Sequence, residues 1–272
     1  MKTVTPPIVL SIAGSDPSAG AGIQQDLKTM TALGAYAATA ITAVTAQNTL
    51  GVQDVMPLPP DIVRTQILAV FADLEVRAVK IGMLPNAPVA AAVCQTLRQA
   101  KERGEAPLHI VYDPVMVSTS GRQLMEADAI AYGAANLFPI CTLVTPNIPE
   151  AEVLCGHPIA GMADVHRAGR ELVRRYGTHF LIKGGHASEG RTLTDSLYMA
   201  DGSTATFSAT RIVTPNLHGT GCTLSSAIAT LLAKGLPMTE AVAQARDFLT
   251  QCIVEGRDCR IGHGNGPLRC GW

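Results

Sequence analysis

The 272-residue chain has an almost balanced charge, with 21 Lys and Arg against 22 Asp and Glu and a formal net charge of -1. It has no basic block interleaved with aromatic residues, which excludes nucleic acid as an expected partner. Hydrophobic residues make up 47% of the chain and charged residues 16%, enough for a sizeable core, so we expect one domain over residues 1–272. No apolar run approaches the roughly 18 residues of a membrane span, and the 7 cysteines form no CxxC pair. These features indicate a cytoplasmic protein with reduced thiols and no membrane partner.

Short β-type runs alternate with helical patterns along the chain. The first expected strand, residues 8–13, ends at Gly14, and an expected helix over 21–33 follows and is closed by Gly34. The further expected strands are 38–46, 78–81, 108–112, two runs that end at 144 and 182, and a hairpin of 194–200 and 204–212. The further expected helices are 60–74, 87–100 and two that begin near 223 and 239. This alternation predicts an α/β fold in which helices cover both faces of a mostly parallel sheet.

Charged residues and glycines gather where the expected strands end. The segments concerned are 14–16, 80–83, 113–116, 147–150 and 183–185. Ligands of open parallel sheets bind beyond the carboxyl ends of the strands, so we expect one site lined by these loops. Ordinary loop sequence explains any one of them, but not as readily all five.

Two common nucleotide-binding signatures and the usual metal-binding spacings are missing. There is no GxxxxGK[ST] sequence, and the GxGxx pattern that begins at Gly20 ends in Gln25 rather than Gly. A Rossmann dehydrogenase is therefore disfavoured. The 7 histidines show no HxxxH or HExxH spacing and predict no metal cluster. His186 and His218 lie near the expected site, where a structural role competes with a functional one for each.

The most distinctive segment is 218–222, His-Gly-Thr-Gly-Cys, which precedes an apolar helical pattern. Two glycines allow a tight turn with converging N–H groups, and the helix N-terminus adds donors and a positive dipole end. This combination predicts an anion hole suited to a phosphoryl group. A cysteine at a helix N-terminus should ionise more easily than a free one, whose pKa is about 8.5, so Cys222 is a candidate proton acceptor. The alternative is a turn with a buried cysteine that matters only by its size.

Seven segments spread along the chain form a specific combination. They are AGSDPSAGAGIQQDLKT (13–29), ITAVTAQNTLGV (41–52), KIGML (80–84), DPVM (113–116), TPNIPEAEVL (145–154), IKGGH (182–186) and HGTGCTLSSA (218–227). In order and spacing they resemble the hydroxymethylpyrimidine and phosphomethylpyrimidine kinases of thiamine biosynthesis, members of the ribokinase superfamily. The resemblance implies a ribokinase-like three-layer α/β/α sandwich with a mostly parallel central sheet.

The resemblance also implies an activity. The family transfers the γ-phosphoryl group of ATP, with Mg²⁺, to the hydroxymethyl group of 4-amino-5-hydroxymethyl-2-methylpyrimidine. A second transfer to the monophosphate gives the diphosphate used to assemble thiamine. Members commonly form homodimers, so a homodimer is expected here.

The resemblance assigns phosphoryl-transfer roles to particular residues. Backbone N–H groups for the migrating phosphoryl would come from Gly219, Thr220, Gly221 and Cys222. Many superfamily members carry an Asp base where this chain carries Cys222. Contacts to ATP would come from Asp113, Asn147 and Lys183, and Mg²⁺ would be held by Asp113 and Glu150, the latter directly or through water. A capping box is the alternative for Asn147 with Glu150, and a solvated side chain is the alternative for Lys183.

The resemblance assigns the pyrimidine site as well. Gln47 offers a donor and an acceptor, which matches the edge of an aminopyrimidine. Asp26 would contact the hydroxymethyl group or a ring nitrogen. The rest of the pocket would be lined by Gly14, Ala21, Met83 and Val115, although core packing is an alternative for the last two. Residues 119–125 are interpreted as a mobile flap over the nucleotide.

Two competing functions stay open. A pyridoxal kinase of the same superfamily shares the Gly-Thr-Gly-Cys turn, and dual activity is possible. Pyridoxal presents a phenolic oxygen where the pyrimidine has an amino group, and Gln47 favours the pyrimidine without deciding the matter. The second alternative is a non-catalytic protein that binds a vitamin precursor. The intact set of Asp113, Glu150, Lys183 and Cys222 argues against it.

Overall fold

The structure, a computed structural model, describes residues 5–104, 108–118, 121–184 and 191–271. Within these residues nine strands form one sheet in the order β3-β2-β1-β4-β5-β6-β7-β8-β9. The strands are β1 (Ile8–Ser15), β2 (Tyr36–Asn48), β3 (Gly51–Pro57), β4 (Val76–Ile81), β5 (His109–Tyr112), β6 (Leu143–Val144), β7 (His179–Ile182), β8 (Thr192–Tyr198) and β9 (Thr204–Thr210). Strands β2, β1, β4, β5, β6 and β7 run parallel to one another, whereas β3 at one edge and β8 and β9 at the other pair antiparallel.

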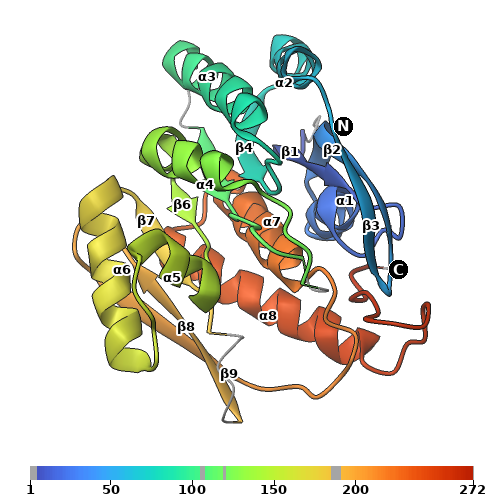
Figure 1. Cartoon of the computed structure of the whole chain (residues 1–272), viewed down its shortest axis with the longest axis vertical. Coiled ribbons are helices and arrows are strands. Elements are labelled where there is room, and N and C mark those ends of the chain that lie inside the picture. The colour runs from blue at the N-terminus through green and yellow to red at the C-terminus, as the bar shows by residue number, and fades with distance from the viewer. Residues whose placement is uncertain (1–4, 105–107, 119–120, 185–190, 272) are drawn as a thin grey trace.

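Helices cover both faces of this sheet (Figure 1). The helices are α1 (Gly22–Ala32), α2 (Pro60–Asp73), α3 (Ala87–Arg103), α4 (Ala127–Tyr132), α5 (Ile148–Cys155), α6 (Met162–Tyr176), α7 (Thr220–Ala233) and α8 (Met238–Gly256), with a π-helical turn (Gly133–Leu137) and a 3-10 turn (Phe138–Ile140) after α4. Helices α2 to α6 pack on one face, and α1, α7 and α8 pack on the other. The predicted α/β/α sandwich with a mostly parallel sheet is therefore confirmed.

The alternation of side chains along each strand separates two hydrophobic cores. Leu10 of β1 and Ile110 of β5 belong to the core under α2 to α6. Their neighbours Val9 and Val111 point the other way, into the core under α1, α7 and α8. Both faces of a parallel sheet need this cover, which explains why the strands read as nearly continuous apolar runs.

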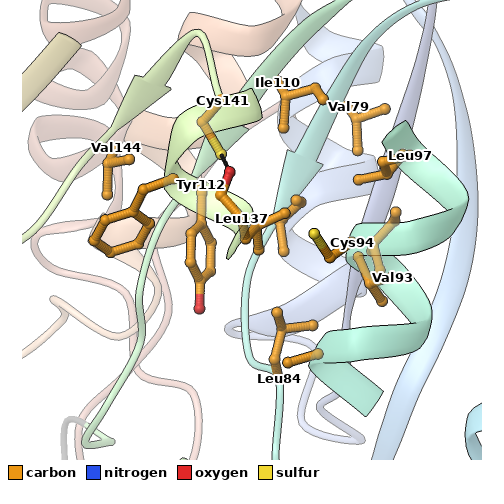
Figure 2. Close-up of a cluster of buried hydrophobic side chains, with 14 of the residues drawn as sticks. Val79, Leu84, Val93, Cys94, Leu97, Ile110, Tyr112, Leu137, Cys141 and Val144 are labelled. Carbon is orange, nitrogen blue, oxygen red and sulfur yellow. Dashed lines mark hydrogen bonds between the residues drawn. The ribbon is translucent and has the colours of Figure 1, made fainter. Parts of the chain in front are cut away.

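The larger core holds the middle of the sheet rigid. Figure 2 shows Val93 and Leu97 of α3 beside Val79 of β4 and Ile110 of β5, all of them fully buried. Full burial of each such side chain contributes about 1.5–3 kcal/mol to folding. Strands β4 and β5 are therefore held firmly by their packing. The loops that follow their carboxyl ends start from fixed positions.

Several element boundaries differ from the sequence-based expectation. Strand β2 continues to Asn48 and turns into β3, an edge strand whose exposed Gln53 and Asp54 conceal it in the sequence. Helix α7 begins at Thr220, about one turn before the expected start near 223. Helices α4 and α6 are not among the expected elements, and the start of α5 is expected only through the capping-box interpretation of Asn147 with Glu150. None of the helices in the described part of the chain has the length and apolar character needed to cross a bilayer.

The glycine-rich segment after α8 packs on its own chain, beside the β2–β3 hairpin (Figure 1). The Asn265 N–H donates to the carbonyl of Thr49 at 2.9 Å, and the His218 N–H donates to the carbonyl of Gly266 at 3.1 Å. A Cβ atom on Gly264 would lie 2.1 Å from the Thr49 carbonyl oxygen, so only glycine fits this approach. This segment therefore ties the hairpin to the turn that precedes α7.

Candidate active site

A cavity of about 660 Å³ lies where β1, β4, β5 and β7 end and where α1 and α7 begin. Its volume falls within the range of roughly 300–1,000 Å³ typical of small-molecule sites. The sequence-predicted residues that line it are Gly14, Ala21, Gln47, Met83, Asp113, Val115, Asn147, Glu150, Lys183, Gly219, Thr220, Gly221 and Cys222. The fold thus brings together all the predicted site residues except Asp26.

The turn before α7 has the geometry of an anion-binding site. Gly219 caps the helix with a φ of 90°, and a Cβ atom there would lie 2.0 Å from the carbonyl oxygen of Gly20, so glycine is required. The N–H groups of Gly221 and Cys222 belong to the first turn, which offers them no intrahelical acceptor. A negatively charged group at this helix end gains from those donors and from the helix dipole.

An ion pair lies directly over this helix terminus. The Lys183 ammonium is 2.6 Å from Oδ1 of Asp113, and the Thr145 hydroxyl donates to the same oxygen at 3.2 Å. A Cβ atom on Gly221 would lie 3.0 Å from Oδ2 of Asp113 and 3.5 Å from the Lys183 ammonium. Burial alone would lower the pKa of Lys183, but the carboxylates of Asp113 and Glu150 hold it above its ordinary value. Lys183 therefore stays positively charged beside the anion-binding turn.

The sequence offers two interpretations of Glu150, a Mg²⁺ ligand and a capping box, and the structure shows the capping box. Glu150 forms the capping box of α5, because its Oε2 accepts from the Asn147 N–H at 2.8 Å and its own N–H donates to the Asn147 side chain at 2.9 Å. Burial, with a smaller contribution from Asp113, raises the pKa of Glu150 to about 7, although the Lys183 ammonium opposes the shift. Burial thus makes the Glu150 carboxyl resist ionisation even though the Lys183 ammonium is near. Together with Asp113 it offers hard oxygen donors, so the residues present fit a divalent cation such as Mg²⁺.

The structure corrects the expectation that Cys222 ionises easily. The pKa of its thiol is raised to about 11, mainly because the site withdraws it from water, and the carboxylates of Asp26 and Asp113 add to the effect. The Lys80 ammonium and the N–H of Gly22 act in the opposite direction but do not prevail. The thiol is therefore neutral near pH 7 in the protein without ligands, and the helix N-terminus alone does not make it a thiolate.

The structure also places Asp26 away from the cavity. Its carboxylate is fully buried and accepts from the Ser11 hydroxyl at 2.5 Å, the Ser226 hydroxyl at 2.7 Å and the Lys80 ammonium at 2.8 Å on both oxygens. The prediction that Asp26 contacts the substrate is not supported by this placement. A buried carboxylate needs such partners. The sequence does not show that Lys80 supplies the positive charge that balances Asp26.

The apolar wall of the cavity includes the buried Met83 and the half-buried Val115. Met83 is 7% exposed, its carbonyl accepts from the Thr42 hydroxyl at 2.7 Å, and its side chain lies 3.5 Å from where a Gly14 Cβ would be. Val115 lines the same cavity. The pocket and the core-packing interpretations thus apply together to Met83.

Two pairs of polar residues in the cavity were not assigned a role from the sequence. The His218 ring nitrogen Nε2 lies 3.0 Å from Oδ2 of Asp16 and also meets the Gln47 amide at 3.1 Å. At the other end, Asp195 of β8 pairs with Arg246 of α8 and accepts from the Gly184 N–H at 2.8 Å. Asp16 ends an expected strand, which is a usable signal. Asp195 and Arg246 meet only through the tertiary fold, so no local pattern reveals them.

Two further sequence-based interpretations concern segments that the structure describes only in part. His186 and Gly185 lie outside the described residues, as do residues 119–120 of the expected flap. In the described remainder of that flap, Leu124 lines the cavity and the Arg122 guanidinium donates to the carbonyls of Val52 and Gln53.

One group of potential metal ligands lies outside this cavity. Donor atoms of Cys155, His157 and Glu171 lie within 4.8 Å of one another, an arrangement that the histidine spacing did not predict. The His157 ring is paired with Glu171 at 3.1 Å, and positive charges of Arg167 and Arg175 act on His157 and Cys155. A surface ion pair among arginines explains this group without a cation.

The cavity thus has two parts. One part holds the N-terminus of α7, the Lys183 ammonium and the carboxyl groups of Asp113 and Glu150. The other part is apolar and contains the Gln47 amide. Phosphoryl transfer needs these elements, because it depends on positioning and on neutralising charge. The fold and the site define a kinase that phosphorylates a small molecule.

Comparison with known proteins gives the family. A family model described as phosphomethylpyrimidine kinase matches residues 16–269. The hydroxymethylpyrimidine/phosphomethylpyrimidine kinase of Rhizobium meliloti is 48% identical over 263 residues, which cover 96% of this chain and 96% of that protein. The thiamine biosynthesis bifunctional protein ThiED of Geobacter sulfurreducens is 44% identical over 261 residues, which cover 96% of this chain and 51% of that protein. The chain belongs to the phosphomethylpyrimidine kinase family.

A solved structure confirms the ribokinase-like fold. The pyridoxal kinase of Staphylococcus aureus in complex with pyridoxal matches with a TM-score of 0.87 and 30% sequence identity, covering 98% of this chain and 94% of that one. The expected fold and the expected kinase class are therefore both confirmed, while the choice of acceptor substrate depends on the site.

Proposed function

We propose that the protein uses ATP to phosphorylate 4-amino-5-hydroxymethyl-2-methylpyrimidine and then its monophosphate, for thiamine biosynthesis. One observation carries the proposal. A single cavity joins Gln47, which suits an aminopyrimidine edge, to the Asp113–Lys183 pair over the N-terminus of α7. An acceptor held at Gln47 and Met83 and a triphosphate held at Lys183 would share this cavity, as in-line transfer requires.

The residues of the chain divide the reaction between them. Lys183 and the N–H groups of Gly219, Thr220, Gly221 and Cys222 stabilise the charge of the phosphoryl group in transit. Asp113 and Glu150 would hold Mg²⁺, and Asn147 orients Glu150 through the capping box. When bound, Mg²⁺ would supply positive charge that neutralises the phosphates.

Cys222 lines the same cavity, in the first turn of α7. A loose transition state needs little help from a base, so a neutral thiol that positions the hydroxyl until late in the transfer is sufficient. In this form the thiol already holds its own proton, so the proton of the acceptor hydroxyl passes to the transferred phosphoryl group or to water rather than to Cys222. A positioning role thereby replaces the sequence-based prediction of Cys222 as a proton acceptor.

We further propose that the chain works as one domain over 1–272, forms a homodimer and acts in the cytoplasm, without nucleic acid or membrane partners. The balanced charge of -1 supports the absence of a nucleic-acid partner.

Pyridoxal phosphorylation is the second candidate function. It is favoured by the similarity to the Staphylococcus aureus pyridoxal kinase at a TM-score of 0.87. A coupled ATPase assay with hydroxymethylpyrimidine, its monophosphate and pyridoxal in parallel separates the candidates. Turnover of both pyrimidines, dependent on Mg²⁺, is the expected result. Pyridoxal as the best substrate would move the protein to vitamin B6 salvage, and binding without turnover would leave a non-catalytic binding protein.

A further inference from the structure

The imidazole of His218 is held in a single orientation at the wall of the cavity. The ring is 8% exposed, and a Cβ atom on Gly20 would lie only 2.3 Å from its Cδ2, so the Gly20 backbone packs directly on the ring. Its backbone N–H donates to the carbonyl of Gly266. Neither the ring nor its backbone has room to turn away from Asp16 and Gln47.

Both carboxylate oxygens of Asp16 accept hydrogen bonds from neighbouring groups. Oδ1 accepts from the Ser18 N–H and hydroxyl at 2.9 and 2.7 Å, and Oδ2 accepts from the Ala21 N–H at 2.8 Å and the Gly20 N–H at 3.2 Å. His218 and the two Ser18 donors hold the pKa of Asp16 below its ordinary value in spite of burial. Asp16 is therefore ionised, and any group that approaches Oδ2 at 3.0 Å must be a donor.

This fixes the proton on His218. Its Nε2 lies 3.0 Å from Oδ2 of Asp16, so Nε2 carries the hydrogen and has no lone pair in the ring plane. The same Nε2 lies 3.1 Å from the amide nitrogen of Gln47. Two N–H donors cannot form a hydrogen bond with each other. The amide oxygen and the amide NH2 group have nearly the same shape, so a half-turn of the amide replaces this clash with a hydrogen bond.

We propose that Asp16 and His218 lock the Gln47 amide with its oxygen on the His218 N–H and its NH2 group toward the cavity, which makes the site selective for 4-amino over 4-oxo pyrimidines. The inference rests on the function proposed above and specifies its acceptor. An NH2 group in the cavity pairs with an unprotonated ring nitrogen, while the amide oxygen remains able to accept from an exocyclic amino group. A 4-oxo pyrimidine carries an N–H and a carbonyl at that edge, and both are mismatched to an amide fixed in this way.

His218 is in this view a positioning residue, and its removal should relax selectivity. Binding is measured by calorimetry without ATP, with 4-amino-5-hydroxymethyl-2-methylpyrimidine and its 4-oxo counterpart as the two probes. The wild type should prefer the amino compound by about tenfold or more, since a mismatched buried donor loses its partner. In His218→Phe the amide turns freely, and the ratio should fall severalfold toward one. His218→Gln, which keeps a donor near Asp16, should restore much of it.

A second variant tests the orientation without changing His218. Gln47→Glu keeps the shape of the side chain but has no donor, so it should weaken binding of the amino compound by about tenfold or more. Steady-state kinetics of the variants should show the loss in KM more than in kcat. An unchanged amino/oxo ratio in His218→Phe, or unchanged binding in Gln47→Glu, would overturn the proposal. Wild-type protein that binds the amino compound selectively but never phosphorylates it would refute the proposed function and leave this inference intact.

Discussion

The Lys80 ammonium lies 2.8 Å from both carboxylate oxygens of Asp26, and both side chains are fully buried beneath the candidate active site. Asp26 and Asp113 hold the pKa of Lys80 above its ordinary value, although burial by itself would lower it. The two opposite charges of this buried ion pair therefore cancel each other close to Cys222.

Removal of one member of this pair should be more damaging than removal of both. Lys80→Met leaves the buried Asp26 carboxylate unpaired, and we expect a loss of about 3–5 kcal/mol in the free energy of unfolding. The double variant Lys80→Met with Asp26→Asn removes both charges and should recover most of that loss. Urea unfolding midpoints measure both effects. A single variant as stable as the wild type would show that the pair does not balance charge.

A methyl group on Gly221 should impair catalysis without unfolding the protein. Its Cβ would lie 3.0 Å from Oδ2 of Asp113 and would push that carboxylate and its Lys183 partner by a few tenths of an ångström. We expect Gly221→Ala to reduce kcat by about tenfold, because misplaced phosphate-binding groups cost transition-state stabilisation. Gly161→Ala is the matched control, since a Cβ at Gly161 meets nothing within 4 Å. Equal kcat values for the two variants would contradict the expectation.

Stability without ligands should depend on pH through Glu150. Its folded pKa, about 7, lies above the ordinary value of 4.5, so between these values the folded protein holds a proton that the unfolded chain has released. The contribution of this group to stability is therefore full below pH 4.5 and is lost as the pH rises to about 7.

Glu150→Gln should remove that dependence. The Tm of the variant relative to wild type should increase from pH 5 to pH 8, as followed by calorimetry without Mg²⁺. Addition of Mg²⁺ with a nucleotide should stabilise the wild type at pH 8 more than the variant, because only the carboxylate is a charged ligand. Parallel Tm curves for the two proteins across this range would show that burial of Glu150 carries no penalty.

The Cys222 thiol should react slowly with alkylating agents at pH 8. With a pKa of about 11 it contains far less thiolate than a free cysteine, and the rate should be lower by about a hundredfold or more than that of a short cysteine peptide. Mass spectrometry of iodoacetamide-treated protein follows this site separately, with Cys222→Ser to identify the peptide. The rate should still climb above pH 9, and a plateau near pH 7 would mean that the thiol ionises as its helix position alone predicts.

The sequence could predict the central sheet and most of the site because these depend on local patterns. Apolar runs followed by Gly14, Asp113 or Lys183 mark strands and their carboxyl ends, and parallel packing then gathers those ends in one place. The capping box of Asn147 and Glu150 is likewise a local pattern, and it is confirmed.

What the sequence could not predict depends on burial and on partners far along the chain. Asp26 is directed away from the cavity because Ser11, Lys80 and Ser226 surround it, and two of these lie more than 50 residues away. The pKa of Cys222 rises because nearby carboxylates and burial outweigh the helix terminus. Neither effect leaves a mark in the local sequence.

The order of the site residues along the chain also bears on synthesis. All nine strands of the described sheet are complete by Thr210, whereas the turn before α7 and the segment that braces His218 at Gly266 come afterwards. Chains fold from the N-terminus as they leave the ribosome. A nascent chain that has emerged only as far as Thr210 therefore contains every strand but lacks both the cover that α7 and α8 give to one face of the sheet and the site for the transferred phosphate, so it cannot consume ATP before α7 has formed.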